Sequence, residues 1–285
     1  MTEKFDPEWL KLREPVDHRS RAAAVISLLV TAWKKNEWSR IVDLGSGTGS
    51  NVRFLSLKLP SVKQWTLVDH DAKLFDRLEE SDSFGEVSCV IGDLADVGLQ
   101  VIRDRRAQLV TGSALLDLVS KEWLTLLAMC CREMSCAAYF ALTYDGTIKW
   151  HFDGGSENAS VRDDEFIRQA VNKHQRREKG LGKALGPMAG LNAETIFRNA
   201  DFRVWLLRSP WLLTKKDAQL VHKLVSGWQT AALDQVEEDK GENYTRATDR
   251  ILEWAESRHE IIDKAEFTLT VGHLDLLALP RESSG

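Results

Sequence analysis

A glycine-rich run with acidic neighbours is the segment whose residue types and spacing point most clearly to chemistry. Residues 43–49 read Asp-Leu-Gly-Ser-Gly-Thr-Gly and follow a short apolar stretch. Glycine adopts backbone conformations that other residues avoid, and it lets a ligand approach the chain closely. The unpaired N–H groups at the start of a following helix suit a carboxylate or another acceptor. The run therefore predicts a ligand-binding turn between a strand and a helix.

The glycine spacing and the acids around it narrow the class of ligand. The pattern is G-x-G-x-G with Asp43 just before it, whereas nicotinamide-dependent enzymes carry G-x-G-x-x-G. A phosphate tolerates a nearby carboxylate poorly, but a ligand with sulfonium and ammonium groups is attracted to it. Asp69 follows Gly49 by twenty residues, at the end of a second apolar stretch. A carboxylate at that position can accept both hydroxyls of a ribose.

The elements that must position these residues alternate between strand and helix in the first half of the chain. This alternation predicts a parallel sheet with helices on both faces, and such sheets bind ligands at the carboxyl ends of their strands. An N-terminal helical segment, residues 7–37, precedes the first strand. The predicted strands are 41–44, 65–71, 86–94, 108–114 and 137–146, with a helix over roughly 120–134.

The second half of the chain is less regular. Residues 151–187 are polar and rich in glycine, and residues 267–280 read as a last strand, which we expect to be antiparallel and inserted into the sheet. The two late amphipathic helices form either a cap or a dimer interface. The expected helices are 188–200, 214–236 and 244–264, and 202–213 is expected to be a sixth strand. The predicted parts are 1–37 (N-terminal helical segment), 38–146 (cofactor-binding core), 147–187 (cap or acceptor insertion) and 188–285 (rest of the core with a helical insertion, 214–264).

Three motifs in this order resemble those of one enzyme family. VDLGSGTGSN at 42–51 resembles the first motif of class I S-adenosylmethionine-dependent methyltransferases. LVDHD at 67–71 and IGDL at 91–94 resemble the acidic motifs after the second and third strands of that family. The resemblance covers roughly residues 40–145. In addition, residues 174–187 resemble a stretch found in a bacterial subfamily of these methyltransferases. The resemblance implies an α/β fold with a Rossmann-like seven-stranded sheet, an N-terminal helix and helical cap insertions.

The resemblance also implies S-adenosyl-L-methionine as the cofactor and a role for each matching residue. Asp43 is expected near the amino-acid end of the cofactor, Asp69 at the ribose, with Asp71 as the alternative, and Asp93 at the adenine amino group. The predicted cofactor-binding residues are Asp43, Gly45, Ser46, Gly47, Thr48, Gly49, Asn51, Asp69, His70, Asp93, Leu94 and Ser113.

The residues around the methyl acceptor are less well marked. Displacement at a sulfonium needs mainly proximity and orientation, worth roughly 7–11 kcal/mol in well-aligned cases, and a base helps only if the acceptor loses a proton. The candidate catalytic residues are Asp117, His174 and Tyr144. Asp117 is equally read as an acid at a helix N-terminus, and His174 as part of a solvated charged segment. In the N-terminal helix, Arg13, Asp17, His18 and Arg21 either close over the cofactor or form surface ion pairs.

Composition favours a small acceptor. The net charge is −5, with 43% hydrophobic and 28% charged residues, which does not indicate a nucleic-acid-binding surface. Residues 111–117 lack the Asn/Asp-Pro-Pro-aromatic motif of many DNA and protein methyltransferases. We therefore expect methyl transfer to an oxygen or nitrogen of a small molecule. An RNA methyltransferase using the basic run 173–183, or a regulatory protein that binds the cofactor without turnover, is the alternative.

The cysteines, the apolar stretches and the N-terminus predict the cellular compartment of the protein. Its four cysteines have no C-x-x-C spacing, and no histidines and acids show metal-ligand spacing, so we expect no metal. No apolar stretch reaches the roughly 18 residues of a membrane span, and the N-terminus has no signal-peptide pattern. These features predict a cytoplasmic protein without a membrane partner.

Overall fold

The central element is a mixed sheet that places the glycine-rich run at its carboxyl edge. The computed structural model describes residues 6–78, 84–152, 158–239, 244–264 and 267–281. The strand order is β3-β2-β1-β4-β5-β8-β6, and β7 also pairs with β8. The strands are β1 (Arg40–Leu44), β2 (Gln64–Asp69), β3 (Glu86–Ile91), β4 (Leu109–Ser113), β5 (Ala137–Phe152), β6 (Phe202–Arg208), β7 (Trp211–Thr214) and β8 (Phe267–Pro280).

The directions of the strands agree with the predicted sheet. Strands β1 to β5 pair in parallel, and β8 runs antiparallel between β5 and β6. The expectation of an antiparallel last strand inserted into a Rossmann-like α/β sheet is therefore confirmed. Strand β7 is an addition to the seven strands expected, because the predicted strand 202–213 is interrupted at Ser209 and Pro210. Proline has no N–H to donate to a neighbouring strand, so the ladder breaks there.

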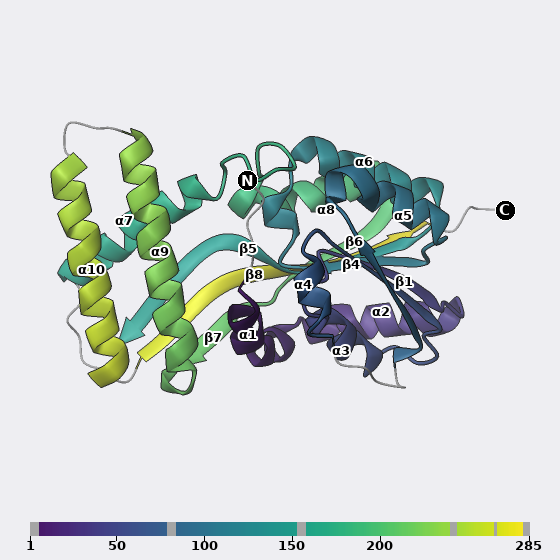
Figure 1. The fold of residues 1–285 in the computed structure, drawn as a ribbon, viewed down its shortest axis with the longest axis horizontal. Coiled ribbons are helices and arrows are strands. Elements are labelled where there is room, and N and C mark those ends of the chain that lie inside the picture. Colours follow the sequence, from purple (N-terminus) through teal and green to yellow (C-terminus); the bar gives the residue numbers. More distant parts are fainter. Residues whose placement is uncertain (1–5, 79–83, 153–157, 240–243, 265–266, 282–285) are drawn as a thin grey trace.

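Helices cover both faces of the sheet (Figure 1). Helices α2 and α3 pack on one face, and α5, α6 and α8 pack on the other. The helices are α1 (Pro7–Ser20), α2 (Ala23–Lys35), α3 (Ser50–Ser56), α4 (Ala72–Phe75), α5 (Leu99–Asp104), α6 (Lys121–Glu133), α7 (Asn158–His174), α8 (Ala189–Asn199), α9 (Ala218–Asp239) and α10 (Tyr244–Lys264).

The alternation of side chains along β1 explains why its apolar run is continuous. Ile41 belongs to the buried cluster that contains Leu29 of α2, whereas Val42 and Leu44 belong to the cluster that contains Leu124 of α6. Successive side chains of a strand point to opposite faces, and both faces of a parallel sheet are covered. An unbroken apolar run is therefore what a central strand of this sheet requires.

Two long strands carry a second helical layer beside the core. Strands β5 and β8 continue past the other strands, and β7 pairs with the extended part of β8. Helices α7, α9 and α10 lie together against this extension, at the left of Figure 1. We call these three helices the helical layer. It comes from the two segments in which a cap was expected, and it packs on the strand extension.

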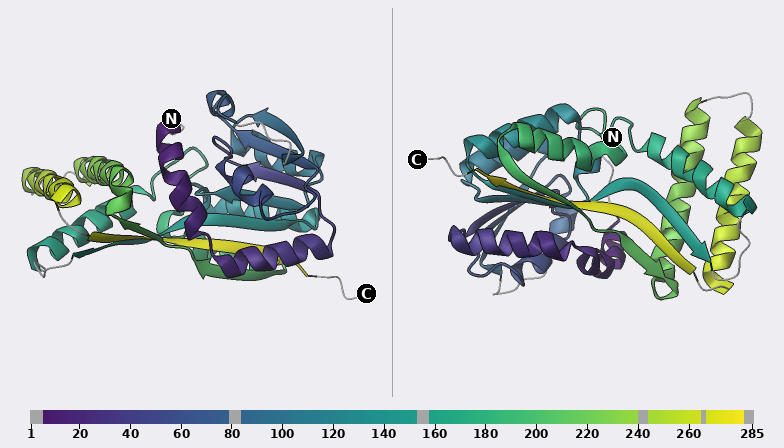
Figure 2. Two further views of the ribbon diagram at one scale, coloured as in Figure 1. Left: turned by 90° about the horizontal axis from the view of Figure 1, so that it is seen from below. Right: turned by 180° about the vertical axis from the view of Figure 1, so that it is seen from behind.

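The N-terminal helical segment is divided in two. Arg21 and Ala22 adopt extended backbone conformations between α1 and α2, and the backbone N–H of Ala22 donates to Asp275 of β8 at 2.9 Å. The same carboxylate accepts from the backbone N–H of Leu142 (2.9 Å) and the hydroxyl of Ser209 (2.6 Å). Asp275 therefore fixes the point at which the chain turns, and Figure 2 shows α1 and α2 running in different directions from it.

Candidate functional site

One cavity lies at the carboxyl edge of the sheet, where the sequence predicted the site. It has a volume of about 160 Å³ and is bounded by the ends of β1 to β4, by α1 and by residues 179–181. Two of the predicted cofactor residues, Asp43 and Gly49, do not line it. The predicted cofactor residues that line it are Gly45, Ser46, Gly47, Thr48, Asn51, Asp69, His70, Asp93, Leu94 and Ser113.

The glycine loop is held tightly against β2. The N–H groups of Gly45 and Ser46 donate to the carbonyl of Val68 at 2.8 and 3.1 Å. Gly49 has a φ of +80°, and a Cβ on it would lie 2.5 Å from Leu78 Cδ2. A side chain at Gly49 would therefore be strained by its backbone and blocked by Leu78. Although Gly49 does not line the cavity, it sets the path of the loop that does, because it precedes the first residue of α3.

Asp69 occupies the end of β2 with both carboxylate oxygens engaged. Oδ2 accepts from the N–H of Gly47 at 2.8 Å, and Oδ1 accepts from the N–H of Asp71 at 3.1 Å. Asp71 instead accepts from the N–H of Lys73 and caps α4. Asp69 lines the cavity and Asp71 does not, so the structure distinguishes the positions of the two ribose candidates.

Asp93 and Leu94 form the corresponding wall after β3. Asp93 Oδ1 accepts from the N–H of Ala95 at 2.9 Å and caps the short helical turn Leu94–Gly98. The carbonyl of Leu94 accepts from the indole N–H of Trp123 at 3.3 Å. These bonds fix the backbone of the wall, and Asp93 and Leu94 both line the cavity.

A buried polar network lies directly behind the loop. The amide of Asn51 donates to Asp43 Oδ1 at 2.9 Å and to the hydroxyl of Thr111 at 3.0 Å. Arg21 donates from Nη2 to Asn51 (3.3 Å) and to the hydroxyl of Ser113 (3.2 Å). Burial raises the pKa of Asp43 to about 7, although the Asn51 hydrogen bond and the Arg21 charge oppose this effect. Asp43 Oδ2 has no hydrogen-bond partner among the described residues.

Helix α1 forms the roof of the cavity. Leu10, Arg13 and Asp17 line it from above the glycine loop. Glu14 accepts two hydrogen bonds from Arg53 of α3, from Nε at 2.7 Å and from Nη2 at 2.5 Å. This pair ties the roof to the helix that follows the loop. Of the two interpretations of the N-terminal residues, closure over the site agrees with the positions of Arg13 and Asp17.

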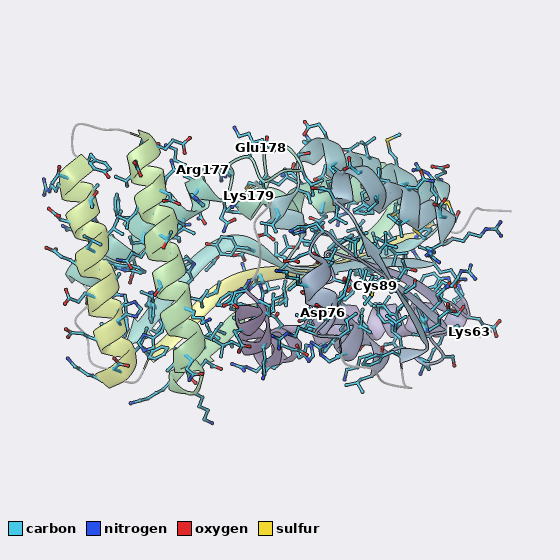
Figure 3. All side chains as sticks on the ribbon, viewed as in Figure 1. Lys63, Asp76, Cys89, Arg177, Glu178 and Lys179 are labelled. Carbon is cyan, nitrogen blue, oxygen red and sulfur yellow. The ribbon has the colours of Figure 1, made fainter. Side chains whose placement is uncertain are left out.

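A tight hairpin closes the opposite side of the cavity. Residues 178–183 form it, Lys179, Gly180 and Leu181 line the cavity, and Figure 3 labels Lys179 between the helical layer and the core. Gly182 has a φ of +86°, and a Cβ there would lie 2.9 Å from Ser120 Cβ. The glycines of this run therefore allow it to pack closely on the segment after β4.

The three candidate catalytic residues lie outside the cavity lining. His174 Nε2, at the end of α7, lies 3.8 Å from the Asp234 carboxylate of α9. The hydroxyl of Tyr144 donates to Asn172 at 2.9 Å, and burial raises the pKa of Tyr144. Asp117 is buried beside the wall residues 114, 115 and 118 of the cavity, and burial raises its pKa to about 6.

Part of the cavity wall consists of residues that no sequence motif marks. Leu10 and Leu74 line the cavity but carry no chemical signal, since they become neighbours of the site only through the packing of α1 and α4. The described residues contain no group of three or more His, Cys, Asp or Glu arranged to hold a metal ion. None of the helices in the described ranges is long and apolar enough to span a membrane.

No protein-family model and no curated protein matches the chain. Among solved structures, it is similar to a phosphoethanolamine N-methyltransferase 2 from Haemonchus contortus in complex with S-adenosyl-L-methionine, at 13% identity over 85% of this chain and 49% of that chain, with a TM-score of 0.37. It is also similar to the cyclopropane synthase MmaA2 from Mycobacterium tuberculosis, at 8% identity over 84% of this chain and 78% of that one (TM-score 0.41). A third likeness is to the YcgJ protein from Bacillus subtilis, at 11% identity over 92% and 100% of the two chains (TM-score 0.46). The chain thus spans about half the length of the Haemonchus enzyme. Because these similarities are distant, the activity of the chain has to be inferred from the geometry of its own site.

Proposed function

We propose that the protein is an S-adenosyl-L-methionine-dependent methyltransferase that acts on an oxygen or nitrogen atom of a small molecule. One observation carries the proposal. The glycine loop, Asp69 and Asp93 follow β1, β2 and β3, which are neighbours in the sheet, and they line a single cavity. A nucleoside lying across these strand ends would have its ribose beside Asp69 and its base beside Asp93, because ribose and base are neighbours in the nucleoside as β2 and β3 are in the sheet.

The residues fit the parts of this cofactor. We propose that Asp69 accepts the ribose hydroxyls and Asp93 the adenine amino group, while the loop from Gly45 to Gly47 lies against the methionine part. Asp17 lines the cavity, and Asp43 lies buried behind the loop. Negative charge at these two positions stabilises a sulfonium and an ammonium group, particularly where the protein excludes water.

When bound, S-adenosyl-L-methionine supplies an electrophilic methyl group, and the chain supplies position. With the cofactor bound, the acceptor atom would bond to the methyl carbon through a lone pair, and the electron pair of the broken carbon–sulfur bond would stay on the sulfur. An acceptor that carries a proton must release it. Asp117 is the candidate base with the best position, because it lies beside the cavity wall and its pKa of about 6 leaves it ionised at neutral pH. The positions of His174 and Tyr144 support no such role.

The basic run offers little support for an RNA substrate. Lys173 and Arg177 form ion pairs with Asp239 and Glu238 of α9, each at 2.5 Å. Charges already paired with acids of the same chain neutralise phosphates less readily, and a nucleic-acid reader usually presents a broad basic face. A small molecule, enclosed between α1 and the 178–183 hairpin, agrees better with the site. This proposal assigns 38–146 to the cofactor and the 147–187 segment to the acceptor.

The cysteines support a reducing setting. All four are free, and Cys130, Cys131 and Cys136 are buried. We infer a cytoplasmic protein from them, since buried thiols persist where the compartment is reducing. Self-association through the outer faces of α9 and α10 stays a prediction.

Labelled methyl transfer tests the proposal. The purified protein is incubated with S-adenosyl-L-methionine carrying a tritiated methyl group, and with either a protein-free cell extract or total RNA. We expect label in the small-molecule fraction. Label only in RNA would support the RNA alternative, and cofactor binding without label in either pool would support the regulatory alternative.

A further inference from the structure

Arg13 presents an unused donor group to the cavity. Its side chain is 12% exposed, and it lines the cavity from α1. Asp17, one helical turn later, accepts from Nε at 2.8 Å and from Nη2 at 3.3 Å. Among the described residues, the hydrogen bonds of this guanidinium are made by Nε and Nη2, and none is made by Nη1. Asp17 therefore holds the guanidinium by its Nε–Nη2 edge, and Nη1 can donate to a ligand in the cavity.

Aromatic neighbours fix the plane of this guanidinium. Arg13 Cζ lies 5.0 Å from the ring centre of Trp211 and 6.0 Å from that of Trp9. His273, which packs against Trp211, is neutral, because burial and the Arg13 charge lower its pKa to about 3. Among the described residues, Asp17 is thus the carboxylate hydrogen-bonded to Arg13. An arginine oriented in this way is suited to bind a second oxyanion.

The opposite wall adds donors. The backbone N–H groups of Gly180 and Leu181, at the tip of the hairpin, donate to no acceptor within the described ranges. Lys179 brings a positive charge to the same wall. Asp69 ends β2 and Asp93 follows β3, whereas Arg13 lies over Trp211 of β7. The cavity is therefore acidic where the nucleoside is proposed to lie, and where α1 faces the hairpin it combines these donors with Asp17, which is paired with Arg13.

We propose that the methyl acceptor is a small molecule carrying an oxyanion, either a carboxylate or a phosphate, and that Arg13 anchors this group. The inference rests on the proposed function and names its substrate class. An arginine with a fixed plane holds an oxyanion at a defined distance and angle, which in turn aims the acceptor atom at the methyl group. The negative group also balances the positive charge of the cofactor.

Thermal denaturation of the protein saturated with S-adenosylhomocysteine tests the anchor directly. Inorganic phosphate and acetate serve as probes, against sodium chloride of equal ionic strength. A ligand that binds the folded state raises the denaturation temperature by mass action. We expect phosphate, acetate or both to raise the temperature for the wild type, and the more effective anion identifies the class of oxyanion.

The variants separate the anchor from the stability of α1. Arg13→Gln should remove the anion-dependent rise, and Arg13→Lys should keep only part of it, because lysine lacks the planar fork. Arg19→Gln is the matched control, since Arg19 lies on the same helix but pairs with Asp217 at the surface. An equal rise in Arg13→Gln and the wild type, or no rise in the wild type, overturns the inference. Unchanged affinity for S-adenosylhomocysteine shows that Arg13→Gln is folded.

Labelled methyl transfer provides the second readout. Products from the protein-free extract are separated on an anion exchanger, with and without phosphatase treatment of the extract. We expect the label to be retained on the anion exchanger and to be reduced roughly 10- to 100-fold in Arg13→Gln, the effect of losing one hydrogen bond to a charged group. Label in neutral or cationic products overturns the inference and leaves the proposed function standing. Absence of both cofactor binding and transfer overturns the two together.

Discussion

Asp43 and Asp69 are carboxylates of neighbouring strand ends whose surroundings give them different properties. Asp69 accepts two backbone N–H groups. Asp43 is fully buried, one of its oxygens has no partner within the described ranges, and its pKa is raised to about 7. In the ligand-free protein, this shift lowers the free energy of unfolding as the pH rises from about 4 to about 7, because the folded state holds the proton more tightly than the unfolded state.

A cationic ligand favours the ionised form of Asp43 over the protonated form, and we therefore expect the affinity for such a ligand to depend on pH. The ionised form of Asp43 attracts a sulfonium, so the affinity for S-adenosyl-L-methionine should rise as the pH increases through about 7. Asp43→Asn should flatten this profile. Calorimetry at a series of pH values measures it, and Asp71→Asn, which alters only the cap of α4, is the control. A profile that is unchanged in Asp43→Asn would contradict the role assigned to this carboxyl.

The loop residues were predictable because their chemistry is local. Three glycines and an acid within 43–49 specify a turn, and the motif spacing places Asp69 and Asp93 at successive strand ends. Arg13 and the 179–181 wall were harder to place, since they reach the cavity from segments more than 30 and 120 residues away from the glycine loop. Helical spacing shows that Arg13 and Asp17 pair, but it does not show what the helix covers. His174 was a candidate because it belongs to a glycine-rich run with several donors, expected to fold over the strand ends, but at the end of α7 it lies beside Asp234 of α9 instead.

At the scale of elements, the helical layer is joined by a buried ion pair. Arg258 of α10 is 2% exposed and donates to Asp164 of α7 from Nε at 3.0 Å and from Nη2 at 2.7 Å. The indole of Trp254 donates to the same oxygen at 2.8 Å, and the guanidinium lies over Trp150 and Phe152. Two helices that are distant in sequence are therefore linked through one carboxylate.

We expect Asp164→Ala to destabilise the protein by about 3–5 kcal/mol, because it leaves the buried Arg258 charge without this partner. Urea denaturation measures the change. Glu260→Ala removes an exposed ion pair with Lys264 from the same helix and should cost less than about 0.5 kcal/mol. Similar losses in the two variants would show that the buried pair contributes no more than a surface pair.

Element types were predicted well where the pattern is strong, and boundaries failed where long-range contacts decide them. The last strand is observed as predicted, over Phe267–Pro280. Helix α7 was missed because it is polar and lies between the glycines of the 151–187 segment, and it is held by contacts with α9 and α10. The N-terminal helix was expected to be continuous, since Asp275, which fixes its break, lies about 250 residues away. Helix α5 was also missed, because it is only six residues long.

At the scale of the whole molecule, α1 joins the core to the helical layer. It contacts α9 and β7, it lines the cavity above the glycine loop, and the Glu14–Arg53 pair ties it to α3. A cofactor enclosed by the loop is therefore also enclosed by α1. We therefore expect a bound cofactor to hold this helix in place.

Hydrogen exchange followed by mass spectrometry tests this coupling. We expect S-adenosylhomocysteine to slow amide exchange in α1 and in residues 178–183, because these segments close the cavity, and to leave α10 unchanged. Arg53→Gln should reduce the protection of α1 by removing its tie to α3. Protection confined to the loop after β1 would contradict a covering role for α1.

Calorimetric titration with S-adenosyl-L-methionine and with S-adenosylhomocysteine tests directly whether the cavity binds this cofactor. We expect micromolar binding of both ligands to the wild type and to Asp71→Ala. We expect binding to be at least about 100-fold weaker in Asp69→Ala, because two hydrogen bonds to a charged group are worth about 1.5–3 kcal/mol each. Absence of binding at millimolar concentrations of both ligands, or equal affinity in Asp69→Ala and the wild type, would contradict the assignment of the cavity to this cofactor.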